Sequence, residues 1–156
     1  MGRPTRVERT TVPYHPMSDH EVRAFLAALP ARTGKLATVR ADGRPHLAPI
    51  WYEVDDDGAL LFNTGATTVK GRNLLREPWA VLCVDDDRPP FSFVTVEGAV
   101  EITDALDEVR HWATRIGGRY MGADRAQEYG ARNGVPGELL IRLRPDRVIS
   151  AADLAD

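Results

Sequence analysis

The segment Phe91–Thr103 is the feature of this sequence that most restricts the fold. Its residues alternate between an apolar face and a mixed face, which is the pattern of a β-strand that buries one side. Gly98 interrupts the apolar face and predicts a bulge or sharp bend, as the corners of a β-barrel require. We therefore expect a curved sheet. The residues of the apolar face are Val94, Val96, Gly98, Val100 and Ile102.

Tight turns connect the first strands of the chain. The predicted strand Lys35–Arg40 is followed by Asp42-Gly43, a strong hairpin signal, and returns as His46–Val54. Pro49 lies inside the return strand, and because proline cannot donate to a ladder, this strand is at an edge or is bent there. Parallel strands need long crossover connections, so these short turns argue against a doubly wound parallel sheet.

The remaining elements predict an antiparallel β-barrel of six or seven strands with attached helices. Ser18 and Glu21 form a capping-box pattern that begins a helix, and Pro30 ends it. The strand Trp79–Asp85 is apolar on both faces, so we expect it to be buried on both sides. Further strands are predicted over 59–64, 137–144 and 147–150, and further helices from residue 104, with a glycine pair at 117–118 weakening its end, and over 123–132.

Length and charge indicate one ordinary globular domain. With 156 residues, the chain fits a single domain over 18–156, preceded by a proline-containing arm over 1–17. Twenty Lys and Arg against 23 Asp and Glu give a net charge of −3, which does not favour nucleic-acid binding. The single Cys83 is expected to be a small buried side chain in a protein of the reducing cytoplasm. No long apolar run favours a membrane span.

The stretch Asn63–Leu74 has the composition of an anion-binding turn and helix start. Gly65 allows the backbone to turn freely, and Thr67 or Thr68 can cap the helix that follows. The first turn of a helix favours negative charge, and Lys70 adds a full positive charge beside it. The alternative is an ordinary capped helix with solvated cations on its surface.

A catalytic site made of side chains alone is not visible in the sequence. The four histidines lack the spacing of zinc ligands, and neither G-x-S-x-G nor the glycine-rich nucleotide motifs occur. The acidic turn 55–57 is expected to be solvated, because no further ligands are spaced to enclose a metal. If the protein is an enzyme, we expect a bound cofactor to carry the chemistry.

Several motifs, in order along the chain, resemble those of the pyridoxamine-phosphate-oxidase-like split barrels. The chain is most similar to the actinobacterial flavin/deazaflavin oxidoreductases that use coenzyme F-420, over about residues 18–104. This resemblance implies a six-stranded antiparallel split β-barrel of the FMN-binding type with peripheral helices. The motifs are Leu36–His46, Pro49–Tyr52, Leu61–Thr64, Val69–Leu74, Val81–Asp85 and Val94–Gly98.

The same resemblance implies a set of cofactor-binding residues and no catalytic side chain. Lys70 maps near the cofactor's phosphate or acidic tail, and the strand that holds Pro49, Ile50 and Trp51 maps along the tricyclic ring. Phe91 and Phe93 match aromatic positions supplied by the second subunit of a dimer. Relatives often have an arginine where this chain has Thr68, so Arg40, Arg44 or Arg76 are candidate substitutes. The predicted cofactor-binding residues are Thr38, Pro49, Ile50, Trp51, Asn63, Val69, Lys70, Arg72, Asn73 and Phe91.

The resemblance implies a homodimeric F-420-dependent oxidoreductase with the cofactor at the subunit interface. It would transfer a hydride between the reduced deazaflavin and an unsaturated small-molecule substrate, whose identity depends on the loops 88–90 and 117–134. FMN is the alternative cofactor. A protein that binds F-420 or flavin without turnover is the alternative of another class. A tetrapyrrole binder is a third possibility, in which His46 or His111 would matter.

Overall fold

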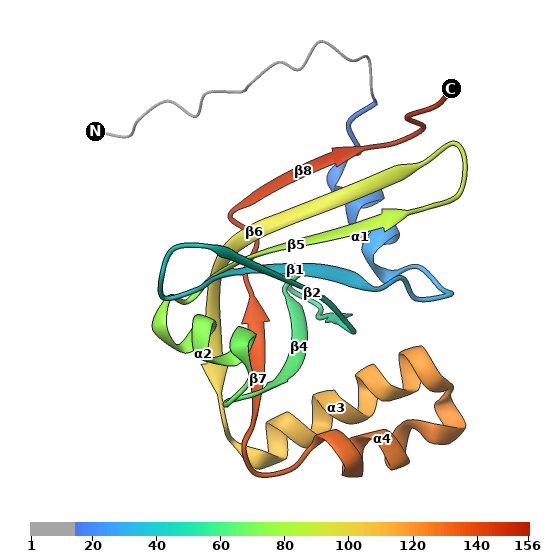
Figure 1. The fold of residues 1–156 in the computed structure, drawn as a ribbon. Helices are drawn as coiled ribbons and strands as arrows, with labels where there is room; N and C mark the ends of the chain where they lie inside the picture. Colours follow the sequence, from blue (N-terminus) through green and yellow to red (C-terminus); the bar gives the residue numbers. More distant parts are fainter. Residues whose placement is uncertain (1–14) are drawn as a thin grey trace.

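The structure, a computed structural model, describes residues 15–156 (Figure 1). Most of the arm predicted over 1–17 lies outside these residues. In the part described, His15 pairs with Ala152, and the backbone N–H of Met17 donates to Ser150 Oγ (3.0 Å). The helices are α1 Asp19–Ala27, α2 Val69–Arg76, α3 Leu106–Met121, η1 Ala123–Arg125 and α4 Ala126–Asn133. The strands are β1 Gly34–Val39, β2 Pro45–Ile50, β3 Glu53–Val54, β4 Leu60–Gly65, β5 Trp79–Asp86, β6 Ser92–Thr103, β7 Glu138–Leu143 and β8 Arg147–Ala151.

The long strand β6 organises the sheet. Its first half pairs with β5 and β8, and its second half pairs with β7, all antiparallel. Gly98 lies at the change of partners, where a side chain would collide with the carbonyl oxygen of Arg144. Figure 1 shows β6 bending there from the upper strands towards β7. The bend predicted at Gly98 is confirmed.

The sheet curls because its two edges are neighbours in the chain. The strand order is β2-β1-β5-β6-β7-β4-β3, so β2 and β3 lie at opposite ends of it. Only Trp51 and Tyr52 separate these two strands in sequence, which forces the two ends of the sheet towards each other. The split-barrel architecture is confirmed, although eight strands form the sheet rather than six. The edge position predicted from Pro49 is also confirmed.

The core fills the inside of this curl. Its large side chains are fully buried, and α1 closes one end, with Leu26 as its buried residue. The predicted capping box is confirmed, since Glu21 N donates to Ser18 Oγ and Ser18 N donates to Glu21 Oε2. The largest core side chains are Tyr52, Phe62, Leu36, Leu60, Leu74, Leu82, Ile141 and Leu143.

The expectation that β5 is buried on both faces is wrong. Ala80, Leu82 and Val84 are buried, whereas Val81 and Cys83 on the other face are only half-buried. Strands β4 and β7 are the ones covered on both sides, because α3 packs on their outer face. The resulting second cluster consists of Leu61, Val109, Leu140 and Trp112.

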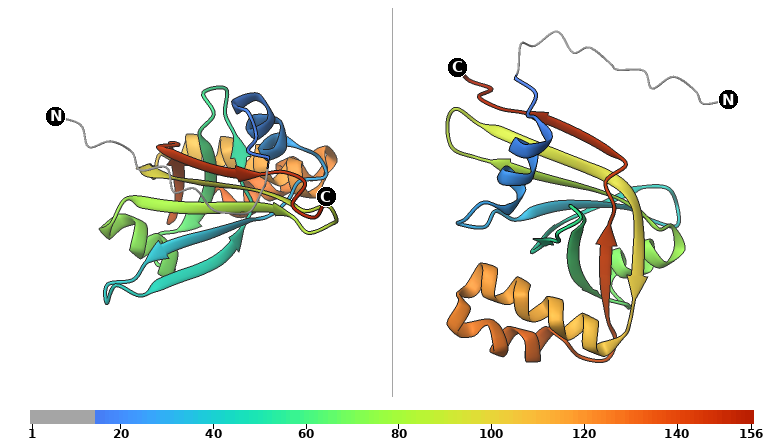
Figure 2. Two further views of the ribbon diagram at one scale, coloured as in Figure 1. Left: turned by 90° about the horizontal axis from the view of Figure 1, so that it is seen from above. Right: turned by 180° about the vertical axis from the view of Figure 1, so that it is seen from behind.

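The helices α3 and α4 form a hairpin on the outer side of β4 and β7 (Figure 2). Gly117 and Gly118, which were expected to weaken the end of α3, lie within its last two turns, and the helix continues to Met121. Instead, they allow close packing, since a side chain at Gly117 would collide with Tyr129 of α4. None of the helices within 15–156 has the length and apolarity needed to cross a membrane.

Candidate functional site

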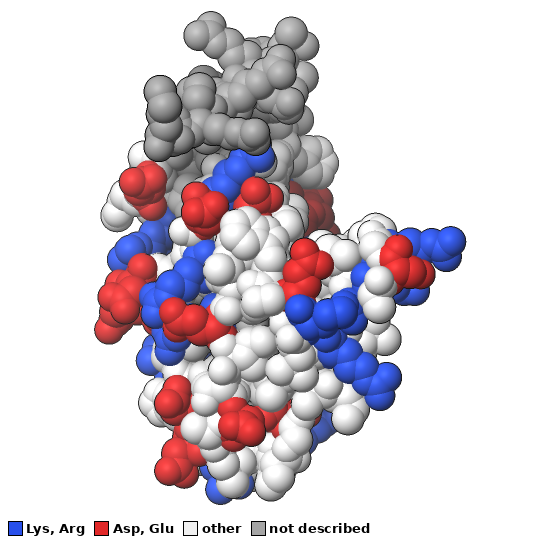
Figure 3. Space-filling view, turned by 90° about the vertical axis from the view of Figure 1, so that its left-hand side faces the viewer, with Lys and Arg blue, Asp and Glu red and all other residues white. Residues whose placement is uncertain are grey.

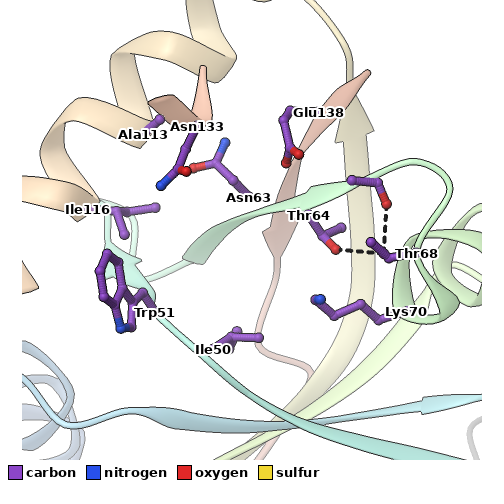
Figure 4. A pocket seen from close by; sticks show the side chains of 11 residues that line it. Ile50, Trp51, Asn63, Thr64, Thr68, Lys70, Ala113, Ile116, Asn133 and Glu138 are labelled. Carbon is purple, nitrogen blue, oxygen red and sulfur yellow. Dashed lines mark hydrogen bonds between the residues drawn. The ribbon is translucent and has the colours of Figure 1, made fainter. Parts of the chain in front are cut away.

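A cavity of about 340 Å³ lies where the ends of β2 and β4 meet the start of α2 and the α3–α4 hairpin (Figure 4). This volume is within the range of small-molecule sites. Apolar residues form one wall and polar residues the other. The lining residues are Ile50, Trp51, Asn63, Thr64, Gly65, Thr68, Lys70, Ala113, Ile116, Asn133 and Glu138.

The turn from β4 into α2 is held rigidly by Thr68. Its Oγ1 accepts a hydrogen bond from Gly71 N (3.1 Å) and donates to the Gly65 carbonyl (2.7 Å), which confirms the predicted N-cap. Thr64 Oγ1 lies 3.2 Å from Thr68 Oγ1. Gly71 has no side chain, and one there would collide with the Gly65 carbonyl. The first turn of α2 therefore has a fixed geometry, and its dipole favours an anion at this end of the cavity.

Lys70 provides the positive charge at the same end. Its side chain extends from the first turn of α2 into the cavity above Ile50 (Figure 4). The ion pairs within residues 15–156 do not include Lys70. An ammonium group without a carboxylate partner, next to a helix start, suits an anionic ligand.

The apolar wall is built on an aromatic stack. Trp51 lies parallel to Tyr120 of α3, with ring centroids 5.1 Å apart and planes 4° apart, and Tyr129 of α4 is tilted against it at 5.7 Å. Ile116 of α3 lies beside the indole, and Ile50 continues the wall towards Lys70 (Figure 4). The wall is wide and flat enough to contact a planar ring.

Partly buried hydrogen bonds hold Tyr120, and through it Trp51, in place. The Tyr120 hydroxyl donates to the Arg32 carbonyl (2.7 Å) and accepts from Tyr52 N (3.2 Å). Burial raises the pKa of Tyr120 to about 12, so its hydroxyl keeps its proton at neutral pH. Arg119 adds hydrogen bonds to the carbonyls of Tyr52 (2.9 Å) and Leu26 (2.7 Å). These contacts fix the α3–α4 hairpin against the barrel.

Two amides and one carboxyl group complete the polar wall. Asn63 and Asn133 point towards each other across the cavity, and Asn63 Nδ2 makes a long hydrogen bond of 3.4 Å to the Val109 carbonyl (Figure 4). Glu138 lies at the Lys70 end. Burial raises the pKa of Glu138, and the nearby charge of Lys70 acts in the opposite direction.

The structure brings together four of the predicted cofactor-binding residues and places the others outside the cavity. Ile50, Trp51, Asn63 and Lys70 line it. Asn73 is 4% exposed and lies behind it, where its Nδ2 donates to Thr38 Oγ1 (3.0 Å). The predicted residues that are exposed on the surface of this chain are Pro49, Val69, Arg72 and Phe91.

None of the arginines considered as substitutes at the Thr68 position lines the cavity. Arg76 is engaged elsewhere, because it donates to the Val39 carbonyl and to Asn73 Oδ1 (3.0 Å). Arg40 and Arg44 belong to the exposed turn between β1 and β2. The positive charge at this end of the cavity therefore comes from Lys70 and from the capped helix start.

The histidines considered for tetrapyrrole binding, His46 and His111, also lie outside the cavity. His46 Nδ1 is buried without a hydrogen-bond partner within residues 15–156. The same residues contain no cluster of three or more side chains suited to a metal ion.

Sequence reasoning missed the half of the cavity that comes from the C-terminal third of the chain. Ala113 and Ile116 lie in the helix predicted from residue 104, where their three-residue spacing fits a buried apolar stripe and indicates no ligand. Asn133 and Glu138 carried no signal, because their position depends on the pairing of β7 with β4, in which Glu138 lies opposite Gly65. The place of Glu138 could have been indicated by one pattern, an acidic residue at the start of a predicted strand next to a glycine-rich turn.

Fold and site together define a split-barrel protein whose cavity has a flat apolar wall and a lysine beside a capped helix start. A family model described as pyridoxamine 5'-phosphate oxidase matches residues 18–151. The chain belongs to this family, as the motifs of its sequence had indicated.

Relatives of known sequence and structure agree with this assignment. A pyridoxine/pyridoxamine 5'-phosphate oxidase of Burkholderia multivorans is 36% identical over 104 residues, which cover 64% of this chain and 47% of the relative. The chain thus spans about half the length of the curated relatives it matches. A conserved hypothetical protein of Mycobacterium tuberculosis superimposes with a TM-score of 0.77 at 27% identity, covering 96% of this chain and 91% of that one. An F420 reductase superimposes with a TM-score of 0.59 at 28% identity, covering 75% and 88%.

Proposed function

We propose that this protein is an oxidoreductase that binds coenzyme F-420 and transfers a hydride between the reduced deazaflavin and an unsaturated organic substrate. The observation that carries the proposal is the combination, in one cavity, of the flat Trp51 wall with Lys70, which forms no ion pair within residues 15–156. A deazaflavin has a planar ring, a ribityl phosphate and an acidic tail, so it needs both features next to each other. The similarity to an F420 reductase at 28% identity supports this choice of cofactor.

The residues of the chain suit the binding and orientation of such a cofactor. Ile50, Trp51 and Ile116 would contact the ring, while Lys70 and the Thr68-capped helix start would hold the phosphate. The bound deazaflavin supplies the hydride chemistry itself. The role of the protein is then to place a substrate over the ring and to exclude water from it.

FMN is the second candidate cofactor. The family model and the curated relatives, which are named as pyridoxine/pyridoxamine 5'-phosphate oxidases, favour it. FMN offers the same ring shape and a ribityl phosphate to the same residues, and the reaction would again be a hydride transfer.

We further propose that the protein acts as a homodimer, with a second copy covering the outer face of β1, β2 and β5. This face carries apolar side chains that the single chain leaves in water, with Leu47 68% exposed and Trp79 42% exposed. Leu47 and Val81 both lie opposite Ala37 in the strand register, so they form one row across the sheet. Figure 3 shows an uncharged strip between charged groups on the side of the molecule that is on the left in Figure 1. Phe91 lies away from the cavity in its own chain, which fits its expected role in the site of a partner.

Reconstitution with each cofactor tests the proposal. The protein is incubated with F-420 and with FMN, and binding is measured by absorbance and fluorescence after gel filtration. We expect tight binding of F-420, followed by oxidation of reduced F-420 with at least one member of a panel of enones and quinones. Tight FMN binding without affinity for F-420 would contradict the cofactor assignment. Tight F-420 binding without turnover on any substrate would instead favour a non-catalytic binding protein.

A further inference from the structure

The carboxyl group of Glu138 shares the anion end of the cavity with Lys70. Glu138 lies opposite Gly65 in the pairing of β7 with β4. Because Gly65 has no side chain, the carboxyl group lies over the turn that leads into α2, with Oε1 3.4 Å from the position of a Cβ at Gly65. Figure 4 shows the side chain of Thr64 between those of Glu138 and Lys70 at this end of the cavity. A ligand anion at the helix start would therefore be close to a carboxyl group.

Lys70 and Glu138 are the two charged side chains among the described residues that line the cavity. They do not form an ion pair with each other within residues 15–156. Burial raises the pKa of Glu138, and Lys70 is the charged group that acts on this carboxyl group, lowering its pKa. The other polar side chains that line the cavity are uncharged, namely Asn63, Thr64, Thr68 and Asn133. With both charged groups ionised, this end of the cavity has no net charge to offset a strongly anionic ligand.

Phosphate groups differ in the charge that they bring to such a place. A phosphomonoester carries a charge of about −1.5 to −2 at neutral pH, because its second ionisation has a pKa near 6. A phosphodiester has one ionisable oxygen and carries a single charge. Repulsion by a carboxylate grows in proportion to the charge of the ligand, so the monoester is affected more strongly.

We propose that Glu138 is a specificity-determining residue that favours a phosphodiester over a phosphomonoester at this end of the cavity. The inference rests on the proposed function, since it takes the ligand to be a ring with a phosphate. The phosphate of F-420 is joined to the ribityl chain on one side and to the acidic tail on the other, so it is a diester. The phosphate of FMN is a terminal monoester. Glu138 thus selects the deazaflavin against FMN.

The test compares two flavins with the same ring and different phosphates. FMN carries the monoester, and riboflavin cyclic phosphate carries a diester formed with two ribityl hydroxyls. Dissociation constants are measured by flavin fluorescence at neutral pH and low salt for the wild type and for Glu138→Gln. Because repulsion scales with charge, we expect the substitution to tighten FMN binding by about tenfold and cyclic phosphate binding by about threefold. An equal factor for both flavins, or no gain for FMN, would overturn the proposal.

Two further variants and one further ligand make the result unambiguous. Glu138→Ala removes the carboxylate with a different side chain and should shift the FMN affinity in the same direction. Glu128→Gln removes an exposed carboxylate on α4 that pairs with Arg125 (2.8 Å), and it should leave both affinities unchanged. F-420 is titrated in parallel. If F-420 fails to bind while the flavins behave as expected, the proposed function is contradicted and the proposed role of Glu138 is supported. If neither flavin binds to any variant, the proposed role of Glu138 is also contradicted.

Discussion

Asn73 and Thr38 support the site without lining it. The resemblance to F-420-dependent proteins implied that both contact the cofactor, but the amide of Asn73 is buried between Thr38 Oγ1 (3.0 Å) and the Arg76 guanidinium (3.0 Å). This arrangement ties α2 to β1. Motif order along the sequence identifies such residues, yet it does not distinguish a side chain that holds the helix from one that touches the ligand.

Asn73→Ala is expected to lower stability more than it lowers ligand affinity. Loss of the amide leaves buried polar groups without partners, at a cost of about 1 to 3 kcal/mol in the free energy of unfolding. Urea denaturation measures this loss in the free energy of unfolding. The double variant of Thr38→Val with Asn73→Leu should cost less than the sum of the single changes, because both partners become apolar together. Unchanged stability with strongly weakened F-420 binding would return Asn73 to the set of ligand-binding residues.

Asp86 is expected to produce part of the acid sensitivity of the protein. Hydrogen bonds from the side chain and backbone of Arg88, together with Arg32, lower the pKa of Asp86 from 3.8 to about 2. A carboxyl group whose pKa is lower in the folded state stabilises the fold at pH values above its pKa in the unfolded state. This stabilisation is lost as the pH falls through the pKa of the folded state. Between about pH 4 and pH 2 the free energy of unfolding of the wild type should therefore fall more than that of Asp86→Asn, which has no carboxyl group to protonate at this position. If the free energy of unfolding changes with pH in the same way for both proteins in this range, Asp86 does not contribute to the acid sensitivity.

At the level of elements, the start of α2 was the most predictable part of the site. The sequence predicted the turn at Gly65, the cap by Thr67 or Thr68 and the cation Lys70, because each depends on local geometry. The wall formed by Trp51 and Tyr120 was less accessible, since its position depends on how the α3–α4 hairpin docks on the barrel.

The cap of α2 gives a prediction of its own. Thr68→Ala removes the acceptor for Gly71 N and should lower the free energy of unfolding by about 1 kcal/mol. It should also weaken anion binding, because the first turn of α2 loosens. Thr68→Ser keeps the hydroxyl and serves as the matched control. Equal stability of the Ala and Ser variants would show that the cap contributes nothing.

For the whole molecule, the curl of the sheet was predictable and the number of strands was not. Gly98 and Pro49 marked a bend and an edge, and both are physical requirements of the backbone. Strand β3 has two residues, too few to give a pattern. The apolar outer face of β5 was interpreted as buried, whereas in the single chain Val81 and Cys83 on this face are only half-buried. A partner subunit would reconcile the apolar pattern with the fold.

Oligomeric state tests this interpretation. Sedimentation velocity should show a dimer for the wild type and a shift to monomer for Leu47→Glu, because the charge would be buried against the second copy. The F-420 affinity of Leu47→Glu should fall as the dimer dissociates, since the site is proposed to lie at the subunit interface. Leu29→Glu, at a residue 73% exposed between α1 and β1, is the control and should remain dimeric. A wild-type monomer with full F-420 affinity would contradict the dimer.

The most direct test of the central claim is a titration of the protein with F-420, comparing the wild type with Lys70→Ala. A charge-assisted hydrogen bond contributes about 1.5 to 3 kcal/mol, so the substitution should weaken binding by about one to two orders of magnitude. Arg23→Ala, which removes an exposed cation on α1, should bind as the wild type does. Equal affinities of the wild type and Lys70→Ala would contradict the assignment of this cavity as the cofactor site.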